Sequence, residues 1–392
     1  MKINFRRATR GLFHISSFLV SKLFYCNDSE DYNYESIIIF RPDNLGDFIL
    51  SLPAISSVRE SFPKAKITCV VNPESELIAK RVCDKVITYV SPFVHSKGLK
   101  DKVNFSYILN KITEIKQEKY DLIVDLRADL LTLLIAVLHR SRFRIDASSQ
   151  RILPVFYKTL NILLRRNLFK TKSIHEMDFT CNLMEKLKVK VECDFDLRKI
   201  ISSKDKSKVL EMIPRYLKKR PFAILHIGAS WEGKRWDIKN FSEIADIIID
   251  KYNLNVFFVG SKSELELSSI AIKLLKFKEN VVNFTGKTNI IDVISLCSMA
   301  NLAVCNDSAI GHIAAMSGVN TISLFGAQDP KNFAPKGKYV YILKKEIECS
   351  PCSQIKCIKS VGNRCMDLIT VNDVISIIDN LDDQLKFKGR LL

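Results

Sequence analysis

One stretch of the sequence places a carboxylate directly after a tight turn, an arrangement that suits a general base. The stretch runs from Arg41 to Asp47, and its pair Pro42 and Gly46 demands a turn after a short apolar run. Asp47 stands at the head of a predicted helix, where it is either a helix cap or a base that takes the proton of a hydroxyl group. The helix dipole favours the ionised carboxylate. Asp43 is the alternative base, but we prefer Asp47 because Gly46 lets the backbone bring a substrate close to it.

A second stretch, from Cys305 to Ala315, follows an apolar run that reads as a buried strand and opens into a predicted helix. Asp307 and Ser308 are good N-cap residues, whose side chains accept from the free N–H groups of the next turn. A helix start after a parallel strand is also a seat for a phosphate, because unpaired N–H groups and the positive end of the dipole point at it. The stretch is therefore either a capped helix or a diphosphate site. His312 is either structural or a donor to a phosphate or to the leaving oxygen.

A glycine-rich loop from His226 to Trp236 favours the diphosphate site. The loop leaves a predicted strand, carries the adjacent cations Lys234 and Arg235, and contains both tryptophans of the chain. Backbone N–H groups and cations of this kind cradle a diphosphate at the end of a strand. The alternative is an exposed loop anchored by aromatic side chains, which is the weaker interpretation beside the phosphate seat of the second stretch.

The elements that hold these stretches alternate between strand and helix in two successive series. This alternation predicts an α/β fold with right-handed crossovers and two parallel sheets, whose ligands bind beyond the carboxyl ends of the strands. Strands are expected at 36–40, 67–71, 86–90 and 122–125, and then at 222–227, 256–259, 281–284, 302–305 and 321–325. Helices are expected at 48–62 with a kink or restart at Pro53, and at 74–82, 105–116, 130–139, 175–187, 240–252, 264–275, 290–299, 313–318 and 371–381.

Residues 202–221, which we expect to hold a polar, basic helix, separate the two series, and we place the domain boundary there. The predicted division is a basic, apolar N-terminal segment at 1–33, a first domain at 34–203, a second domain at 204–374, and a C-terminal tail at 375–392. Two parallel sheets of this kind would face each other across a cleft.

The composition is that of a globular protein with a strong positive charge. Of 392 residues, 47% are apolar and 26% are charged, which excludes a disordered chain. The formal net charge of +17 suits nucleic acid, an anionic membrane surface or a phosphorylated substrate. We expect no nucleic-acid partner, because the sequence contains no RNA-binding signature and no aromatic-rich basic stripe.

Two basic segments bear on a membrane partner. Residues 1–25 combine a basic start with the uncharged run 11–21, which is too short to span a bilayer. This segment is either a helix in the membrane interface or a helix packed against the protein. Residues 140–172 are strongly basic with interleaved apolar and aromatic side chains, which favours a patch for anionic lipid or phosphorylated glycolipid over a solvated face.

The cysteines fall into two groups. Most of the eleven lie in apolar runs, which is typical of buried free thiols in a reducing cytosol. Four thiols near the C-terminus could bind zinc, form two disulfides or pack as free thiols, and we leave these alternatives open. They are Cys349, Cys352, Cys357 and Cys365.

Four motifs in this order resemble glycosyltransferase family nine, the lipopolysaccharide heptosyltransferases. The resemblance extends from Ile37 to Val374, and four separated motifs are far more specific than one. It implies a GT-B fold, with the acceptor in the first Rossmann-like domain and the nucleotide-sugar in the second. The motifs are Asp43-x-x-Gly46-Asp47, the 228–236 loop, Phe284-Thr285-Gly286-Lys287-Thr288, and Asn306-Asp307-Ser308-x-x-x-His312.

The resemblance also implies the reaction. The family's enzymes transfer a heptose from an ADP-activated donor to the lipopolysaccharide core, with inversion and without a metal. We therefore expect an ADP-sugar donor, an anionic glycolipid acceptor and no cofactor. We expect the protein in the cytoplasm, peripheral on the inner face of the cytoplasmic membrane.

Residue roles carry over position by position. Asp47 matches the family's catalytic base, and we group Arg41, Asp43 and Gly46 with it on the acceptor side. Ser230 and Lys234 match donor-phosphate contacts, to which we add Arg235, and Glu264 falls where the family places a residue near the nucleoside. The donor-binding turn matches Asp307, Ser308 and His312.

The sequence departs from the family at the donor-binding turn. Ala309 stands where the family usually has glycine, and its methyl group would crowd a phosphate approaching that N–H. This departure bears on the donor's identity more than on the fold.

Two other functions compete with sugar transfer. A nucleotide-sugar epimerase of GT-B type would react with the donor alone. A non-enzymatic membrane- or nucleic-acid-binding module would explain the charge but not two phosphate loops.

Overall fold

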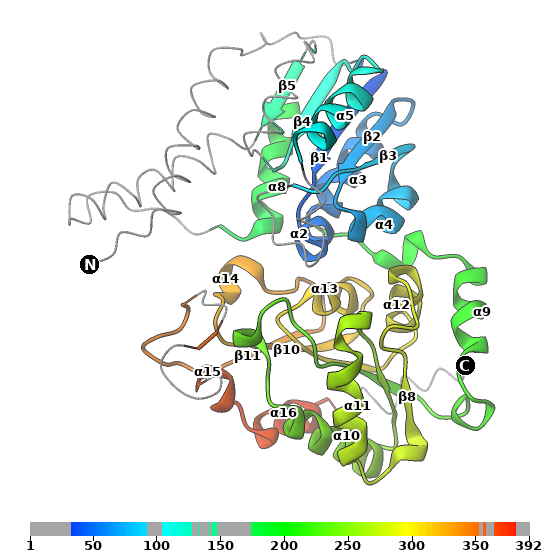
Figure 1. Ribbon diagram of the computed structural model, residues 1–392, viewed down its shortest axis with the longest axis vertical. Coiled ribbons are helices and arrows are strands. Elements are labelled where there is room, and N and C mark those ends of the chain that lie inside the picture. Colours follow the sequence, from blue (N-terminus) through cyan, green and yellow to red (C-terminus); the bar gives the residue numbers. More distant parts are fainter. Residues whose placement is uncertain are drawn as a thin grey trace. The chain divides into compact units, whose positions relative to one another are not determined.

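The structure is a computed structural model that describes residues 33–91, 104–127, 132, 141, 143–146, 174–352, 356–357 and 364–381. The chain divides into two compact units, Met1–Cys193 and Asp194–Leu392, which are described one at a time (Figure 1). The division falls before residue 203, where the sequence placed the boundary. The predicted segment 1–33 except its last residue, the predicted helix 130–139 except Thr132, and most of the basic stretch 140–172 lie outside the described residues.

The first unit is built on a parallel sheet of five strands in the order β3-β2-β1-β4-β5. The central strand β1 has a continuous buried apolar run, Ile37 to Phe40, as expected for a strand covered on both faces. The strands are β1 (Ser36–Arg41), β2 (Lys66–Val71), β3 (Lys85–Thr88), β4 (Leu122–Asp125) and β5 (Phe143–Asp146).

Helices complete the first unit, and α8 packs against α3 (Figure 1). Of the two alternatives at Pro53, a kink or a restart, the structure shows a restart, because α2 ends at Leu50 and α3 starts at Leu52. Proline is tolerated there because the N–H it lacks has no partner in the first turn. The helices are α2 (Leu45–Leu50), α3 (Leu52–Ser61), α4 (Glu76–Val82), α5 (Phe105–Lys116) and α8 (Glu176–Met184).

The second unit holds a parallel sheet of six strands in the order β11-β10-β9-β6-β7-β8. Its two central strands, β9 and β6, are completely buried. Five of the strands were predicted, and β11 at the edge was not. The strands are β6 (Phe222–His226), β7 (Asn255–Phe258), β8 (Val281–Asn283), β9 (Leu302–Asn306), β10 (Asn320–Phe325) and β11 (Val340–Lys344).

The helices of this unit include the predicted donor-site helix, which starts at Ala309 and therefore earlier than the expected residue 313. Short 3-10 turns, among them Glu232–Lys234 and Lys262–Glu264, join the strands to the helices. The helices are α9 (Ser203–Glu211), α10 (Ile238–Tyr252), α11 (Leu265–Leu274), α12 (Ile290–Cys297), α13 (Ala309–Met316), α14 (Pro330–Phe333), α15 (Arg364–Asp367) and α16 (Val371–Asp379).

The last helix, α16, packs beside α10 within the second unit (Figure 1). Its apolar face, with Val374 and Ile378, joins that unit's core. The predicted return of the C-terminal tail to the first domain stays a prediction. Residues 382–392 lie outside the described part of the chain. Nowhere in the described ranges is there a helix with the length and apolarity needed to cross a bilayer.

Candidate functional site

The two predicted phosphate segments meet at the carboxyl ends of β6 and β9. These strands are neighbours, and His226 at the end of β6 lies in register with Cys305 of β9. The Asn306 side chain joins the segments, because its amide donates to the Ile227 carbonyl (2.7 Å) and its oxygen accepts from the Trp236 N–H (3.0 Å). The sheet topology therefore places the 226–236 loop beside the start of α13.

A buried ion pair lies between these segments. Lys234 Nζ is 2.8 Å from Asp307 Oδ2, with side chains 12% and 6% exposed. The same ammonium lies 4.7 Å from the centre of the Trp231 ring, a distance at which a cation–π contact is favourable. Burial raises the pKa of the Asp307 carboxyl, and Lys234 opposes that rise. The loop thus fixes a positive charge at the start of α13.

The start of α13 is not capped as the sequence suggested. We expected the side chains of Asp307 and Ser308 to accept from the first N–H groups of the helix. Ser308 is the N-cap residue, but it makes no side-chain cap hydrogen bond. Its Oγ instead lies 2.9 Å from Nδ1 of His226, and Asp307 is engaged by Lys234. Both side chains therefore interact with groups other than the first N–H groups of the helix. This favours an anion-binding site over a capped helix N-terminus.

Glu264 approaches the same place from the 3-10 turn that follows β7. Its Oε2 accepts from the Ser261 N–H (2.7 Å) and hydroxyl (2.8 Å), and lies 3.6 Å from His226 Nε2. Burial raises the carboxyl pKa, but the contacts with His226 and Ser261 outweigh it and lower the pKa to about 2. Glu264 is therefore a fixed anion at neutral pH.

Position 228 requires glycine because the Glu264 side chain occupies the space where a Cβ atom would lie. A Cβ on Gly228 would lie 1.7 Å from Glu264 Oε1. We therefore expect Gly228→Ala to displace the carboxylate and to reduce affinity for a nucleotide-sugar donor about tenfold, the value of one charged hydrogen bond. Calorimetry on Gly228→Ala, Glu264→Ala and the double variant tests this. In the Glu264→Ala background, Gly228→Ala should reduce donor affinity little further, because the carboxylate is no longer there to be displaced. If the losses of affinity from the two changes were fully additive, the steric explanation would be wrong.

The other predicted donor residues lie on the same two segments. Ser230 is exposed on the loop after β6, and the half-buried Arg235 donates from Nη2 to the Ala229 carbonyl at 3.3 Å. His312 is buried within α13, one turn beyond Ser308. The loop is anchored from below by Trp236, which is fully buried and donates from Nε1 to the Ile369 carbonyl at 2.7 Å.

In the first unit, Asp47 lies in the first turn of α2 and is half-buried. Its backbone carbonyl accepts from the Arg41 guanidinium (3.3 Å from Nε and 3.1 Å from Nη2) and from the Ser51 hydroxyl (2.9 Å). The N-cap residue Asn44 makes no side-chain cap hydrogen bond. The backbone beneath the Asp47 carboxylate is thus held firmly at the positive end of a helix.

Arg41 and Asp43 form a buried charge network under this turn. Arg41 is 1% exposed and pairs with Asp43 (3.0 Å) and with Glu176 of α8 (2.6 Å). Burial alone would lower the pKa of this guanidinium, but the surrounding carboxylates raise it. Asp43 is also buried and pairs with Arg127 as well. The sequence did not identify Glu176 or Arg127, although Arg127 follows a predicted strand at its carboxyl end.

Among the four C-terminal cysteines, Cys349, Cys352 and Cys365 are present as thiols. Cys365 is buried, and burial together with the neighbouring Cys352 and Cys349 raises the pKa of its thiol. Among the described residues, no group of three or more histidine, cysteine or acidic side chains is placed to hold a metal ion. Of the four side chains, Cys365 is buried, Cys349 and Cys357 are half-buried, and Cys352 is exposed.

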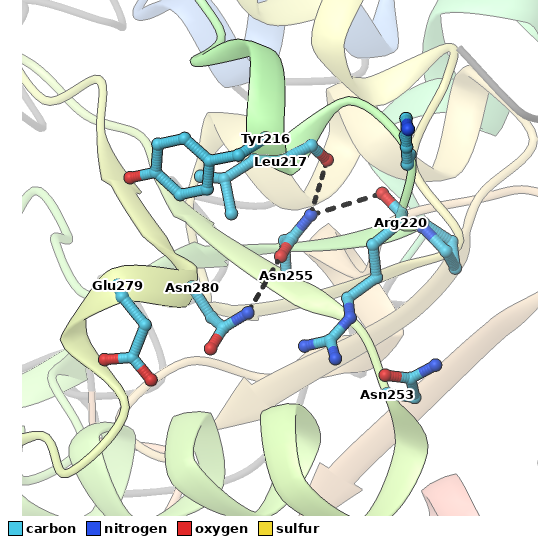
Figure 2. Close-up of a pocket in the computed structure, with 9 residues that line it drawn as sticks. Tyr216, Leu217, Arg220, Asn253, Asn255, Glu279 and Asn280 are labelled. Carbon is cyan, nitrogen blue, oxygen red and sulfur yellow. Dashed lines mark hydrogen bonds between the residues drawn. The ribbon is translucent and has the colours of Figure 1, made fainter.

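A hollow of about 440 Å³ lies at the other end of the sheet, where β6 and β7 begin (Figure 2). Asn255 stands at its centre and donates to the carbonyls of Leu217 (2.8 Å) and Arg220 (3.2 Å). Asn280 donates to the Asn255 oxygen at 3.4 Å, so protein groups already satisfy this amide. Ligands of parallel sheets bind at the carboxyl ends of strands, which makes this hollow a poor candidate for the main site.

This chain is similar to known proteins in both fold and sequence. A model described as "Glycosyltransferase family 9 (heptosyltransferase)" matches residues 108–361. The lipooligosaccharide heptosyltransferase 2 of Campylobacter jejuni is 24% identical over 88% of this chain and 98% of its own length. The lipopolysaccharide core heptosyltransferase OpsX of Haemophilus influenzae is 24% identical over 77% of this chain and 82% of its own.

The solved structure of Escherichia coli ADP-heptose lps heptosyltransferase II resembles the whole fold. It has a TM-score of 0.64 at 16% identity and covers 90% of this chain and 99% of its own. The predicted fold class, α/β with two parallel sheets of the GT-B type, is confirmed. Since the family match spans well over half of the 392 residues, the chain belongs to glycosyltransferase family 9, the heptosyltransferase family.

Proposed function

We propose that this enzyme transfers a heptose, or a closely related sugar, from an ADP-activated donor to the lipopolysaccharide core or another cell-surface glycolipid. The observation that carries the proposal is the convergence of Lys234, the start of α13 and Glu264 at the carboxyl ends of β6, β7 and β9. The names of the relatives, which are lipopolysaccharide and lipooligosaccharide heptosyltransferases, support the choice of donor and acceptor.

The proposed reaction is a single displacement with inversion. The ionised Asp47 takes the proton of the acceptor hydroxyl, and that oxygen attacks the anomeric carbon of the donor sugar. The bond from the anomeric carbon to the diphosphate breaks, and its electrons go to the departing diphosphate oxygen. Lys234 and the N–H groups at the start of α13 stabilise that charge. Because the chain supplies this positive charge itself, we propose a metal-independent transfer.

The remaining donor residues take roles that follow from their places. Ser230 and Arg235 lie on the Lys234 loop, and we assign them to the diphosphate together with Ser308 and His312. The anionic Glu264 can only accept hydrogen bonds, so we assign it to donor groups of the nucleoside, such as hydroxyls. These residues all belong to the second unit, which we propose as the donor domain.

On the acceptor side we change two assignments, those of Arg41 and Asp43. Arg41 was grouped with the acceptor-binding residues, but it is 1% exposed and its guanidinium is engaged by Asp43, Glu176 and backbone carbonyls. We propose that Arg41 and Asp43 support the turn that carries Asp47 rather than contact the acceptor. Gly46 remains at the surface of that turn, next to the proposed base. The first unit is then the acceptor domain.

The proposed place of action is the cytoplasmic face of the inner membrane. A glycolipid acceptor is held in a membrane, and a net charge of +17 attracts the protein to anionic lipid. The basic stretches that would make this contact, 1–25 and most of 140–172, lie outside the described residues.

A thermal-shift panel of nucleotide-sugars tests the proposed donor. At a ligand concentration of 100 times Kd, binding stabilises the folded state by about 2.7 kcal/mol. For a unit of this size that raises Tm by about 5–10 °C. We expect this shift with ADP-heptose and a much smaller one with UDP- or GDP-sugars. The absence of a shift with every ADP-sugar would contradict the proposal.

A further inference from the structure

We propose that His226 is a positioning residue of the donor site, which holds the Ser308 hydroxyl and the Glu264 carboxylate at the same time and takes up a proton when the donor diphosphate binds. This inference rests on the proposed function, since it concerns how the same site receives its donor. His226 was not among the site residues that the sequence indicated.

The imidazole joins three separate elements. His226 is the last residue of β6 and is 4% exposed. Its Nδ1 lies 2.9 Å from Ser308 Oγ at the start of α13. Its Nε2 lies 3.6 Å from Glu264 Oε2, at the turn that leads into α11. One buried ring therefore sets the position of two groups that the proposed function assigns to the diphosphate and to the nucleoside.

The hydrogen-bonding capacity of these groups links the ring to the ligand. The Glu264 carboxylate can only accept, so Nε2 carries a proton toward it. If the ring is neutral, Nδ1 is an acceptor and uses the only proton of the Ser308 hydroxyl, which then presents lone pairs to the site. If the ring is protonated, Nδ1 donates to Oγ, and the Ser308 proton is available for a phosphate oxygen. An anionic ligand therefore favours the protonated ring.

The charges around the ring are compatible with this change. Glu264 Oε2 lies 3.6 Å from Nε2 and is a fixed anion. On β9 the register neighbour is Cys305, whose thiol stays neutral because burial raises its pKa to about 12. On the adjoining loop and turn, Lys234 pairs with Asp307, and the loop also carries the charged residues Glu232 and Arg235. A diphosphate adds negative charge beside this set.

The test measures proton uptake by calorimetry of ADP-heptose binding to the full chain, in buffers of different ionisation enthalpy near pH 7.5. The diphosphate of ADP-heptose is a diester, so the ligand itself does not titrate there. We expect the wild-type protein to take up a fraction of a proton. We expect His226→Asn, which keeps a polar atom near Ser308 but cannot ionise, to show no uptake and about tenfold weaker binding.

A second variant separates positioning from folding. Ser308→Ala leaves the imidazole in place but removes the hydroxyl that links it to the ligand, so proton uptake should also fall strongly. Ser376→Ala, on the exposed face of α16, is the matched control and should behave as wild type. Wild-type binding without proton uptake, or unchanged uptake in Ser308→Ala, would overturn the role of His226 and leave the proposed function intact. A wild-type protein that binds no ADP-sugar would overturn the proposed function itself.

Discussion

An Asp47→Asn variant is expected to lose about 10²- to 10⁴-fold in the rate of sugar transfer, the contribution of a positioned general base, while its affinity for ADP-heptose stays unchanged. Asparagine has nearly the same shape but cannot take a proton. The backbone of this turn is fixed by Arg41 and Ser51 through the Asp47 carbonyl, so the side chain can change without moving the turn. Single-turnover kinetics measures the rate, and calorimetry measures the affinity.

Two further variants make the assignment specific. Glu60→Gln changes an exposed acid of α3 and should leave transfer unchanged. Asp43→Asn removes a buried charge that lies between Arg41 and Arg127, so it should lower the free energy of unfolding by about 3–5 kcal/mol. Normal turnover by Asp47→Asn would show that another group is the base. A loss of rate in Asp43→Asn at full stability would point to Asp43.

The apolar runs of the central strands made most of the fold predictable. In the second unit β6 and β9 are buried along their whole length, so their sequences carry no ambiguity between strand and surface loop. Once they are parallel neighbours, the residues after His226 and after Asn306 must lie side by side. The proximity of the loops that carry Lys234 and Asp307 could therefore be predicted from the sequence.

The two strands that we did not predict, β5 and β11, lie at the edges of the sheets. β11 contains the apolar run Val340 to Leu343, which is typical of a strand, although all five of its residues are only half-buried. β5 lies inside a strongly basic stretch, and its Arg144 is nonetheless buried. The charge of this stretch did not predict a buried strand, because the burial of a residue depends on partners that the local sequence does not contain.

Long-range contacts also decided the roles of polar residues. Ser308 has the residue type of an N-cap, but its hydroxyl meets His226, 82 positions earlier in the chain. Arg41 has the type of an anion-binding residue at the end of a strand, but Glu176 engages it from 135 positions away. Propensity describes what a side chain can do locally, and the tertiary fold selects which of those contacts is made.

Replacing Lys234 with alanine is expected to have two separate effects. Affinity for ADP-heptose should fall about 10- to 150-fold, the value of one to two charged hydrogen bonds to the diphosphate. The free energy of unfolding should also fall by about 3–5 kcal/mol, because the variant leaves Asp307 buried without its partner. Calorimetry with ADP-heptose and urea unfolding measure the two effects.

The two effects can be separated because they have different origins. Lys234→Ala combined with Asp307→Asn removes the uncompensated charge, so stability should recover while affinity stays low. Lys251→Ala is the matched control: it breaks the half-exposed pair with Asp379, which should cost at most about 1 kcal/mol and leave donor affinity unchanged. If Lys234→Ala bound ADP-heptose as tightly as wild type, the ammonium would serve only the fold. The charge that stabilises the leaving diphosphate would then have to come from Arg235 and the start of α13.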